Sequence, residues 1–278
     1  HDVKSGTTFT NGGSGTINSD KVPTPNQPLI TYTPEPDKHW TLGAKDVDGK
    51  TFINGDTATA QVSMELPEAD KLAVKLNKVA LDDDFTNYQD KVTFVSATVT
   101  EAGADVTDQY NIIVKDGHVT ATRKDAASAP SGKAVLTSVF QINHDVKSGT
   151  IFINSGSGTV NTETVPTPDQ PIITYTPDTD KHWTEGDQVV DGKIVINDSV
   201  VTGQVSMTLP EPGDLAAPLT KVQVDDDYTN YQDKVAFVSA HVLENGTDVT
   251  GLYSVTVKDG HVTAIRKDAA STPAGNVM

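Results

Sequence analysis

Residues 82–92 read DDDFTNYQDKV, and residues 225–235 read DDDYTNYQDKV. The two segments lie 143 residues apart and differ only where Tyr228 replaces Phe85. The same offset holds further out without a gap, because DKHW at 37–40 returns at 180–183 and KDGHVTA at 115–121 returns at 258–264. A solenoid unit has only ~20–50 residues, so a period this long is a whole domain. The 278-residue chain therefore carries two copies of one domain.

Each copy is rich in strand-forming residues. The segment 91–100, KVTFVSATVT, alternates apolar and polar residues over much of its length, which predicts a strand. Residues 110–123 predict a hairpin with Asp116-Gly117 at its turn, because glycine accepts the positive φ of a type I′ turn. Further strands are expected at 135–146, 150–154 and 159–165. A β-sandwich is the expected result.

Composition excludes several classes of function. The chain has no cysteine, so it has neither disulfides nor a thiolate site. Its formal net charge of −17 disfavours binding to nucleic acid or to anionic lipid headgroups. No apolar run approaches the ~20 residues that span a membrane. No nucleophile elbow, phosphate loop or zincin motif is present, and we expect a protein that is not an enzyme.

Two proline-rich segments, 22–36 and 165–177, share the motifs VPTP and TYTP. Proline lacks a donor for a sheet ladder and stiffens the chain toward polyproline II. We interpret both segments as semi-rigid linkers between domains. The alternative is an edge segment inside one domain.

The repeat frame predicts three parts. Residues 1–36 are expected to be the closing strands of a preceding repeat with its linker, 37–179 a complete repeat, and 180–278 a second repeat without its last strands. Residues 1–22 match 144–165 and could complete a second copy in a neighbouring molecule by head-to-tail strand complementation. In the alternative frame the units run 1–135 and 144–278, with the proline segment internal.

The motifs KHW at 38–40, DDF at 83–85 and TVNTETVP at 159–166 resemble the C-terminal isopeptide-forming domains of antigen I/II adhesins of streptococci and lactic-acid bacteria. The resemblance covers one full copy and most of the second. It implies an all-β chain of tandem immunoglobulin-like or CnaA-like β-sandwich domains. It also implies an internal amide between an early lysine and a late asparagine, assisted by an acidic residue, and a capacity to hold calcium. The upstream ligand-binding head of that family is absent from these residues, so adhesive specificity does not carry over.

The resemblance suggests Lys38, Asn161 and an acid from the run 82–84, with Asp83 preferred. The rival acceptor is Asn154, which also lies on a late strand. Burial would lower the pKa of such a lysine and favour the neutral amine that attacks the amide, while a carboxyl group relays the proton. The corresponding residues of the second repeat are Lys181, Asp226 and, in the strand-donation frame, Asn18.

No cofactor is expected to be required, but calcium binding is possible, with Asp82 and Asp84 as tentative ligands. The expected function is a structural stalk module of an extracellular, cell-wall-anchored bacterial surface adhesin, locked by Lys–Asn isopeptide bonds. The alternative is a module that binds a host glycan or protein directly. The expected partners are adjacent repeats and a host surface ligand, without nucleic acid or membrane insertion.

Overall fold

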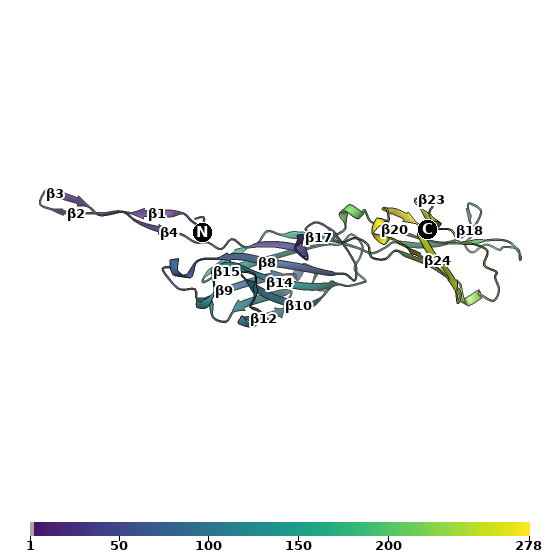
Figure 1. Cartoon of the computed structure of the whole chain (residues 1–278), viewed down its shortest axis with the longest axis horizontal. Helices are drawn as coiled ribbons and strands as arrows, with labels where there is room; N and C mark the ends of the chain where they lie inside the picture. The colour runs from purple at the N-terminus through teal and green to yellow at the C-terminus, as the bar shows by residue number, and fades with distance from the viewer. Residues whose placement is uncertain (1–2) are drawn as a thin grey trace. The chain divides into compact units, whose positions relative to one another are not determined.

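The computed structural model describes residues 3–278 (Figure 1). The chain divides into two compact units. The first comprises the residues up to Gly49, Gly55–Asn143 and Phe152–Ile172, and the second comprises Lys50–Asn54, His144–Ile151 and Ile173–Met278. The helical elements of the described chain are short 3-10 turns: η1 (Ala69–Lys71), η2 (Thr86–Tyr88), η3 (Thr107–Gln109), η4 (Ala126–Ser128), η5 (Pro212–Asp214), η6 (Thr229–Tyr231), η7 (Thr250–Leu252) and η8 (Ala269–Ser271). No helix in residues 3–278 is long and apolar enough to cross a membrane.

The first unit contains a six-stranded antiparallel sheet in the order β11-β10-β14-β8-β5-β6. Its strands are β5 (Asp37–Leu42), β6 (Lys45–Asp46), β8 (Thr57–Leu66), β10 (Val92–Glu101), β11 (Ala104–Asp105) and β14 (Gly132–Ile142). Alternate residues of β8 and β14 are buried, as expected when one face of a sheet covers a core.

A second sheet of this unit runs β12-β13-β9-β15, and β16 continues it as a hairpin partner of β15. Its strands are β9 (Val79–Asp84), β12 (Tyr110–Lys115), β13 (His118–Arg123), β15 (Ile151–Val160) and β16 (Glu163–Pro166). The predicted hairpin turn is confirmed, because Asp116 and Gly117 have φ values of 51° and 80°.

The core of the first unit is filled by side chains from both sheets. Its largest fully buried apolar members are Trp40, Tyr88, Phe140, Phe152, Met64, Leu81, Leu136 and Ile142. Tyr88 and Phe152 stack with ring centroids 4.7 Å apart and an interplanar angle of 8°. The expected all-β sandwich is therefore confirmed.

Residues 8–30 form a ribbon of four short strands: β1 (Thr8–Asn11), β2 (Ser14–Ile17), β3 (Asp20–Pro23) and β4 (Gln27–Ile30). In Figure 1 these strands are drawn in purple at the N-terminal end. β1 pairs with β4, and β2 pairs with β3. Every residue of the four strands is exposed.

The second unit repeats the fold in a less complete form. One sheet has the order β19-β18-β20-β26-β22-β23, and another has the order β21-β25-β24. Their strands are β18 (Thr179–Glu185), β19 (Gln188–Val189), β20 (Thr202–Leu209), β21 (Gln223–Asp227), β22 (Leu243–Glu244), β23 (Thr247–Asp248), β24 (Tyr253–Lys258), β25 (His261–Arg266) and β26 (Gly275–Val277). β7 (Thr51–Ile53) and β17 (Gln170–Tyr175) form a parallel pair.

The segment 165–177 joins the two units, because the boundary between them falls within it, between Ile172 and Ile173, but it is not a plain linker. This segment supplies the end of β16 and all of β17, and Ile172 and Thr174 within it are fully buried. The prolines do not prevent strand pairing here because they lie at strand ends or at second positions. The 22–36 segment likewise contributes to β3 and all of β4 instead of forming a plain linker. The strands expected at 150–154 and 159–165 are also different, since 151–160 is one continuous strand.

Candidate cross-link site

Lys38 lies on β5 and points into the core of the first unit. Its side chain is 0% exposed, and its Nζ donates a hydrogen bond to Asp83 Oδ1, on β9 of the other sheet. The Asp83 side chain is also 0% exposed. Charged side chains are almost never buried this completely without a function or a well-matched partner. The pair thus joins the two sheets through the centre of the sandwich.

Burial lowers the pKa of the Lys38 amine, and the charge and hydrogen bond of Asp83 act against that effect. The net direction is downward, so the neutral amine is more accessible here than on a surface lysine. A neutral amine has the free electron pair that a nucleophile needs.

Asn154 lies on β15 and is 0% exposed. Neither its Oδ1 nor its Nδ2 has a hydrogen-bond partner among the described residues, and Asp83 Oδ2 is likewise unpaired. A buried carboxamide normally satisfies both its donor and its acceptor, since each unpaired group costs about 1–3 kcal/mol. An amide with no partner at either end is therefore an anomaly that calls for a chemical explanation.

Strand geometry places this amide near the Lys38–Asp83 pair. Asp83 lies opposite Gly156 in the register of β9 and β15, so Asn154 is its diagonal neighbour on the same face. A side chain at Gly156 would point at the Val62 methyl group, 3.0 Å from its Cβ. Val62 is the residue paired with Lys38 across β5 and β8. The inward face of β15 is therefore directed toward Lys38. Gly156 has no side chain and leaves space beside the Asn154 amide.

The structure gives Asn161 a different role. Its φ is 56°, and its Oδ1 accepts hydrogen bonds from the backbone N–H groups of Asn77 and Lys78, at 2.7 and 3.4 Å. It forms the tight turn between β15 and β16, where asparagine tolerates the left-handed conformation. The Asn161 carboxamide therefore stabilises the turn. The carboxamide of Asn154, the rival acceptor, lies in the core.

The second unit contains the same lysine and acid in an open setting. Lys181 Nζ donates to Asp226 Oδ1, but the two side chains are 42% and 23% exposed. Asn18 has a φ of 58° and lies in the turn between β2 and β3 of the exposed ribbon. Like Asn161, it is a turn residue, and no contact joins it to Lys181 among the described residues.

The two tentative calcium ligands, Asp82 and Asp84, make other contacts in this structure. Strand alternation turns Asp83 inward, while Asp82 and Asp84 face the other side of β9. Asp82 accepts hydrogen bonds from Thr120 at 2.6 Å and contacts His118 at 2.8 Å, and Asp84 binds the start of η2. Across residues 3–278 no group of three or more histidine or acidic side chains is arranged to hold a metal ion.

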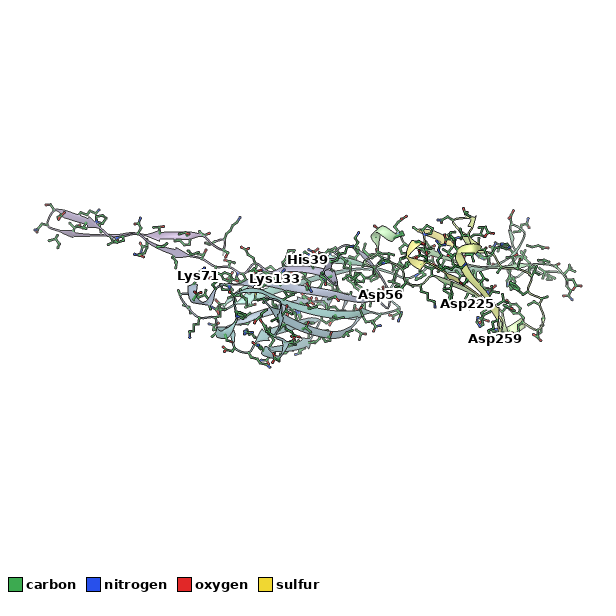
Figure 2. All side chains as sticks on the ribbon, viewed as in Figure 1. His39, Asp56, Lys71, Lys133, Asp225 and Asp259 are labelled. Carbon is green, nitrogen blue, oxygen red and sulfur yellow. The ribbon has the colours of Figure 1, made fainter. Side chains whose placement is uncertain are left out.

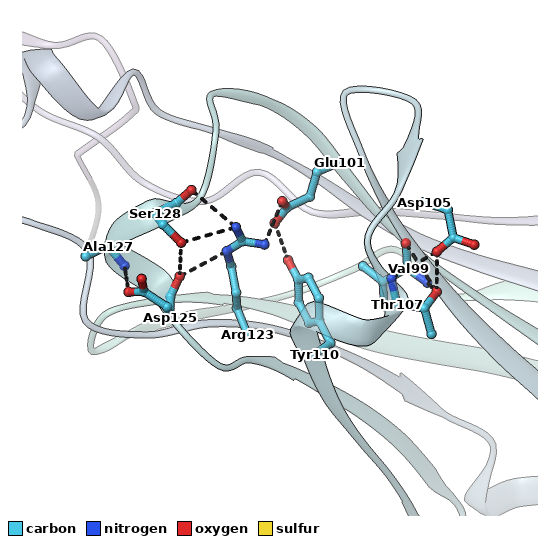
Figure 3. Close-up of polar contacts among 9 residues, drawn as sticks. All are labelled: Val99, Glu101, Asp105, Thr107, Tyr110, Arg123, Asp125, Ala127 and Ser128. Atoms are coloured by element: carbon cyan, nitrogen blue, oxygen red, sulfur yellow. Dashed lines mark hydrogen bonds and ion pairs between the residues drawn. The ribbon is translucent and has the colours of Figure 1, made fainter.

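A buried ion network lies where β10 ends, at Glu101 (Figure 3). The sequence did not reveal it. Arg123 Nη1 donates to Glu101 Oε2 at 2.7 Å, and the Tyr110 hydroxyl donates to Glu101 Oε1 at 2.7 Å. Arg123 also binds the carbonyls of Asp125 and Ser128. The signal that could have found it is the return of all three side chains in the second repeat, as Glu244, Tyr253 and Arg266.

A histidine clamp lies beside the site, near the surface. His39 Nδ1 contacts Asp48 Oδ2 at 2.7 Å, and Nε2 contacts Asp37 Oδ2 at 3.1 Å; its position is labelled in Figure 2. Asp48 Oδ1 also accepts a hydrogen bond from the backbone N–H of Trp40. The hydrogen bond to Asp48 raises the pKa of His39, because it favours the protonated ring. This clamp holds the strand that carries Lys38.

The fold and site together define a pair of all-β units, the more complete of which buries a Lys–Asp pair and an asparagine in its core. The family model of the cell surface antigen I/II C2 terminal domain matches residues 36–167 and 177–275. The chain therefore belongs to this family of cell-surface proteins. A search of curated protein sequences gave no match.

Two solved structures share the fold. The C-terminal domain of the Streptococcus pyogenes antigen I/II-family protein AspA is 14% identical, with a TM-score of 0.70 over 87% of this chain and 88% of that chain. The C-terminal domain of the Streptococcus agalactiae antigen I/II polypeptide BspA is 13% identical, with a TM-score of 0.64 over 87% and 89% of the two chains. At these identities the likeness establishes the fold.

Proposed function

We propose that this chain is a stalk module of a cell-wall-anchored surface adhesin, and that its first unit is locked by an amide bond between Lys38 and Asn154. The observation that carries the proposal is the buried Asn154 carboxamide, unpaired at both ends, on the strand that faces a buried lysine–aspartate pair. Membership of a cell-surface antigen family supports the setting.

The reaction needs no external reagent. Transfer of the shared proton from Lys38 Nζ to Asp83 Oδ1 gives a carboxylic acid and a neutral amine, and burial lowers the pKa of the Lys38 amine toward this neutral form. The amine then attacks Cγ of Asn154, and Asp83 donates its proton to the developing oxyanion. Collapse of the tetrahedral intermediate breaks the Cγ–Nδ2 bond and forms the Cγ–Nζ amide. The leaving nitrogen departs as ammonium with the surplus proton, and Asp83 is again a carboxylate.

Proximity of the two reacting groups lowers the barrier to the reaction. Fixing an amine and an amide within one core replaces an encounter in solution, and intramolecular placement of this kind accounts for as much as ~7–11 kcal/mol of a barrier. The reaction occurs once per molecule during folding, so it is not enzymatic turnover. Calcium plays no part in the proposal.

The bond joins an early strand to a late one, which suits a stalk under tension. Lys38 and Asn154 are 116 residues apart, and at ~3.5 Å per extended residue the bond withholds about 400 Å of chain from stretching. A tie across the sandwich would raise kinetic stability against force and proteolysis. Direct binding of a host ligand stays a prediction, since nothing in the two units favours a particular surface for it.

Single-molecule stretching tests the mechanical role. Wild-type chains held at their two ends should lack an unfolding step of about 400 Å, and the Asn154→Ala variant should regain it. Asn161→Ala is the matched control, since it removes a carboxamide only a few residues further along and should behave as wild type. A full-length unfolding step in the wild-type protein would overturn the proposal.

A further inference from the structure

The Tyr88 hydroxyl is buried in the core of the first unit without a hydrogen-bond partner among residues 3–278. Tyr88 ends η2, the turn that follows β9, and its side chain is 0% exposed. A phenylalanine would fill nearly the same space without the free-energy cost of burying an unpaired hydroxyl. The fold alone therefore gives no reason for a tyrosine at this position.

The inward face of β15 places the Asn154 carboxamide between Tyr88 and Asp83. Phe152, Asn154 and Gly156 follow one another on this face, in two-residue steps of about 7 Å. The Phe152 ring stacks on Tyr88, with centroids 4.7 Å apart. At the other end, Gly156 lies opposite Asp83 in the register of β9 and β15. The amide thus has the catalytic carboxyl group on one side and the tyrosine on the other.

The strand that carries the lysine gives the same placement. Trp40 is the next inward residue of β5 after Lys38, and its ring centroid lies 6.0 Å from that of Tyr88. The tyrosine ring therefore packs on the neighbour of each reacting residue, Trp40 on one strand and Phe152 on the other. This arrangement holds the ring one step along the core from the proposed bond.

The Tyr88 hydroxyl keeps its proton near neutral pH. Burial raises its pKa well above the usual value, and the charges of Asp83 and Asp84 add to this effect. An influence of Asp83 on the ring agrees with the placement that the strands give. The hydroxyl is therefore available as a hydrogen-bond donor within the site.

The second unit keeps a tyrosine at the equivalent position. Tyr231 packs on its tryptophan with ring centroids 6.0 Å apart, the same distance as in the first unit. Three residues earlier the two copies differ, because Phe85 is replaced by Tyr228. The motif thus accepts either ring at one aromatic position and carries a hydroxyl in both copies at the other.

Ser138 supplies the other buried hydroxyl that could serve the site. It lies on β14, its Oγ is unpaired, and it belongs to the opposite sheet from Asn154. Packed sheets lie about 10 Å apart, and a serine side chain is too short to span much of that distance. Tyrosine reaches further, so Tyr88 is the better placed donor.

We propose that the Tyr88 hydroxyl is a second catalytic group of the first unit, which donates a hydrogen bond to the side-chain oxygen of Asn154 during amide formation. The inference rests on the proposed function, since it assigns a role in the same reaction. Attack of Lys38 Nζ on Cγ turns this oxygen into an oxyanion, and a fixed donor stabilises an oxyanion strongly where water is excluded.

The balance of the reaction is unchanged by this donor. Tyr88 donates a hydrogen bond without losing its proton, Asp83 still carries the proton in transit, the Cγ–Nδ2 bond breaks, and ammonium leaves. The hydroxyl makes no hydrogen bond in the unreacted structure. An interaction that forms only as the oxyanion develops lowers the barrier without stabilising the starting state.

Refolding of unreacted chains tests the role of the hydroxyl. Chains recovered from inclusion bodies in denaturant, at their full sequence mass, are diluted into buffer, and the loss of about 17 Da is followed by intact mass against time. Tyr88→Phe should fold and lose ammonia about 10²–10³-fold more slowly than the wild type, the usual effect of removing one oxyanion donor.

Tyr110→Phe is the matched control, because it removes the hydroxyl of another buried tyrosine, one that donates to Glu101. It should react at the wild-type rate but unfold at a lower denaturant concentration. Tyr88→Phe should show the opposite pattern. In the Asn154→Ala background, where no bond can form, it should be as stable as its parent or more so. Ser138→Ala should react at the wild-type rate.

The outcomes separate this inference from the proposed function. A wild-type chain that keeps its full mass contradicts both. Loss of ammonia from Tyr88→Phe at the wild-type rate contradicts the inference alone. Equal slowing by Tyr88→Phe and Tyr110→Phe also overturns it, because a weakened core would then be the cause. Slowing by Ser138→Ala without slowing by Tyr88→Phe would assign the donor to the serine.

Discussion

Lys38 and Asp83 form a hydrogen-bonded pair in which neither side chain has any exposed surface. The equivalent pair in the second unit keeps the hydrogen bond but is 42% and 23% exposed. The two units thus hold an equivalent ion pair in two settings, fully buried in the first and partly exposed in the second.

Removal of the acceptor amide should destabilise the first unit. In the chain-entropy treatment of a cross-link, closing a loop of about 116 residues stabilises by ~4–5 kcal/mol, so Asn154→Ala should lower the free energy of unfolding by about that amount. Denaturant unfolding of the variant and of Asn161→Ala provides the measurement. Without the bond the sign reverses, because Asn154→Ala would then delete a buried, unpaired amide and leave stability unchanged or higher.

Asp83 should be the one acid of the run 82–84 that the reaction needs. Asp83→Ala should yield folded protein that retains the ammonia, as read from its intact mass, because no group can then take the Lys38 proton. Asp82→Ala and Asp84→Ala should react as the wild type does, since these carboxylates face away from the core. Loss of the bond in either control, or its presence in Asp83→Ala, would move the catalytic role elsewhere.

Removal of one partner of the Glu101–Arg123 pair should strongly lower the free energy of unfolding. Glu101→Ala leaves a buried guanidinium without its carboxylate and should cost about 3–5 kcal/mol in denaturant unfolding. Tyr110→Phe, which removes one hydrogen bond to the same carboxylate, should cost about 1 kcal/mol. If both substitutions lowered the free energy of unfolding equally, the charge of Glu101 would not be its main contribution to stability.

The histidine clamp should make stability depend on pH. The pKa of His39 is raised in the folded state, so its contribution is complete below the unfolded value of about 6.5 and is lost as pH rises through the folded pKa. Asp48, Asp37 and Asp46 are the charges that act on the ring. The melting temperature of the wild type should therefore fall, relative to that of His39→Gln, as the pH rises above about 6.5. Parallel pH profiles for the two proteins would contradict the assignment.

Much of the fold follows from sequence patterns that act locally. Period-two alternation in 91–100 and the Asp116-Gly117 turn identify strands and a hairpin because each depends on neighbouring residues. In the proline segment 165–177 the composition indicates a linker but does not reveal the strands, because the fold accepts prolines at strand ends and beside a buried Ile172. Tertiary pairing decided that case, and no local pattern reports it.

The proposed site depends on both kinds of information. Short motifs suggested Lys38 and Asp83, but the proposal of Asn154 in place of Asn161 as the acceptor rests on the path of one strand. Phe152 and Asn154 share the inward face of a continuous β15, a pattern visible in the alternation of 151–154. Asn161 precedes a threonine at a two-residue turn, where its positive φ is common for asparagine. The alternation at 151–154 was the signal available in the sequence. It was missed because two separate strands, 150–154 and 159–165, were predicted in place of one.

Intact mass measurement of the purified wild-type chain tests the central claim most directly. The account predicts that the first unit's bond lowers the mass by about 17 Da relative to the sequence, and that both Lys38→Ala and Asn154→Ala have the masses their own sequences give. A wild-type chain at its full sequence mass, with no peptide that joins Lys38 to Asn154, would contradict it.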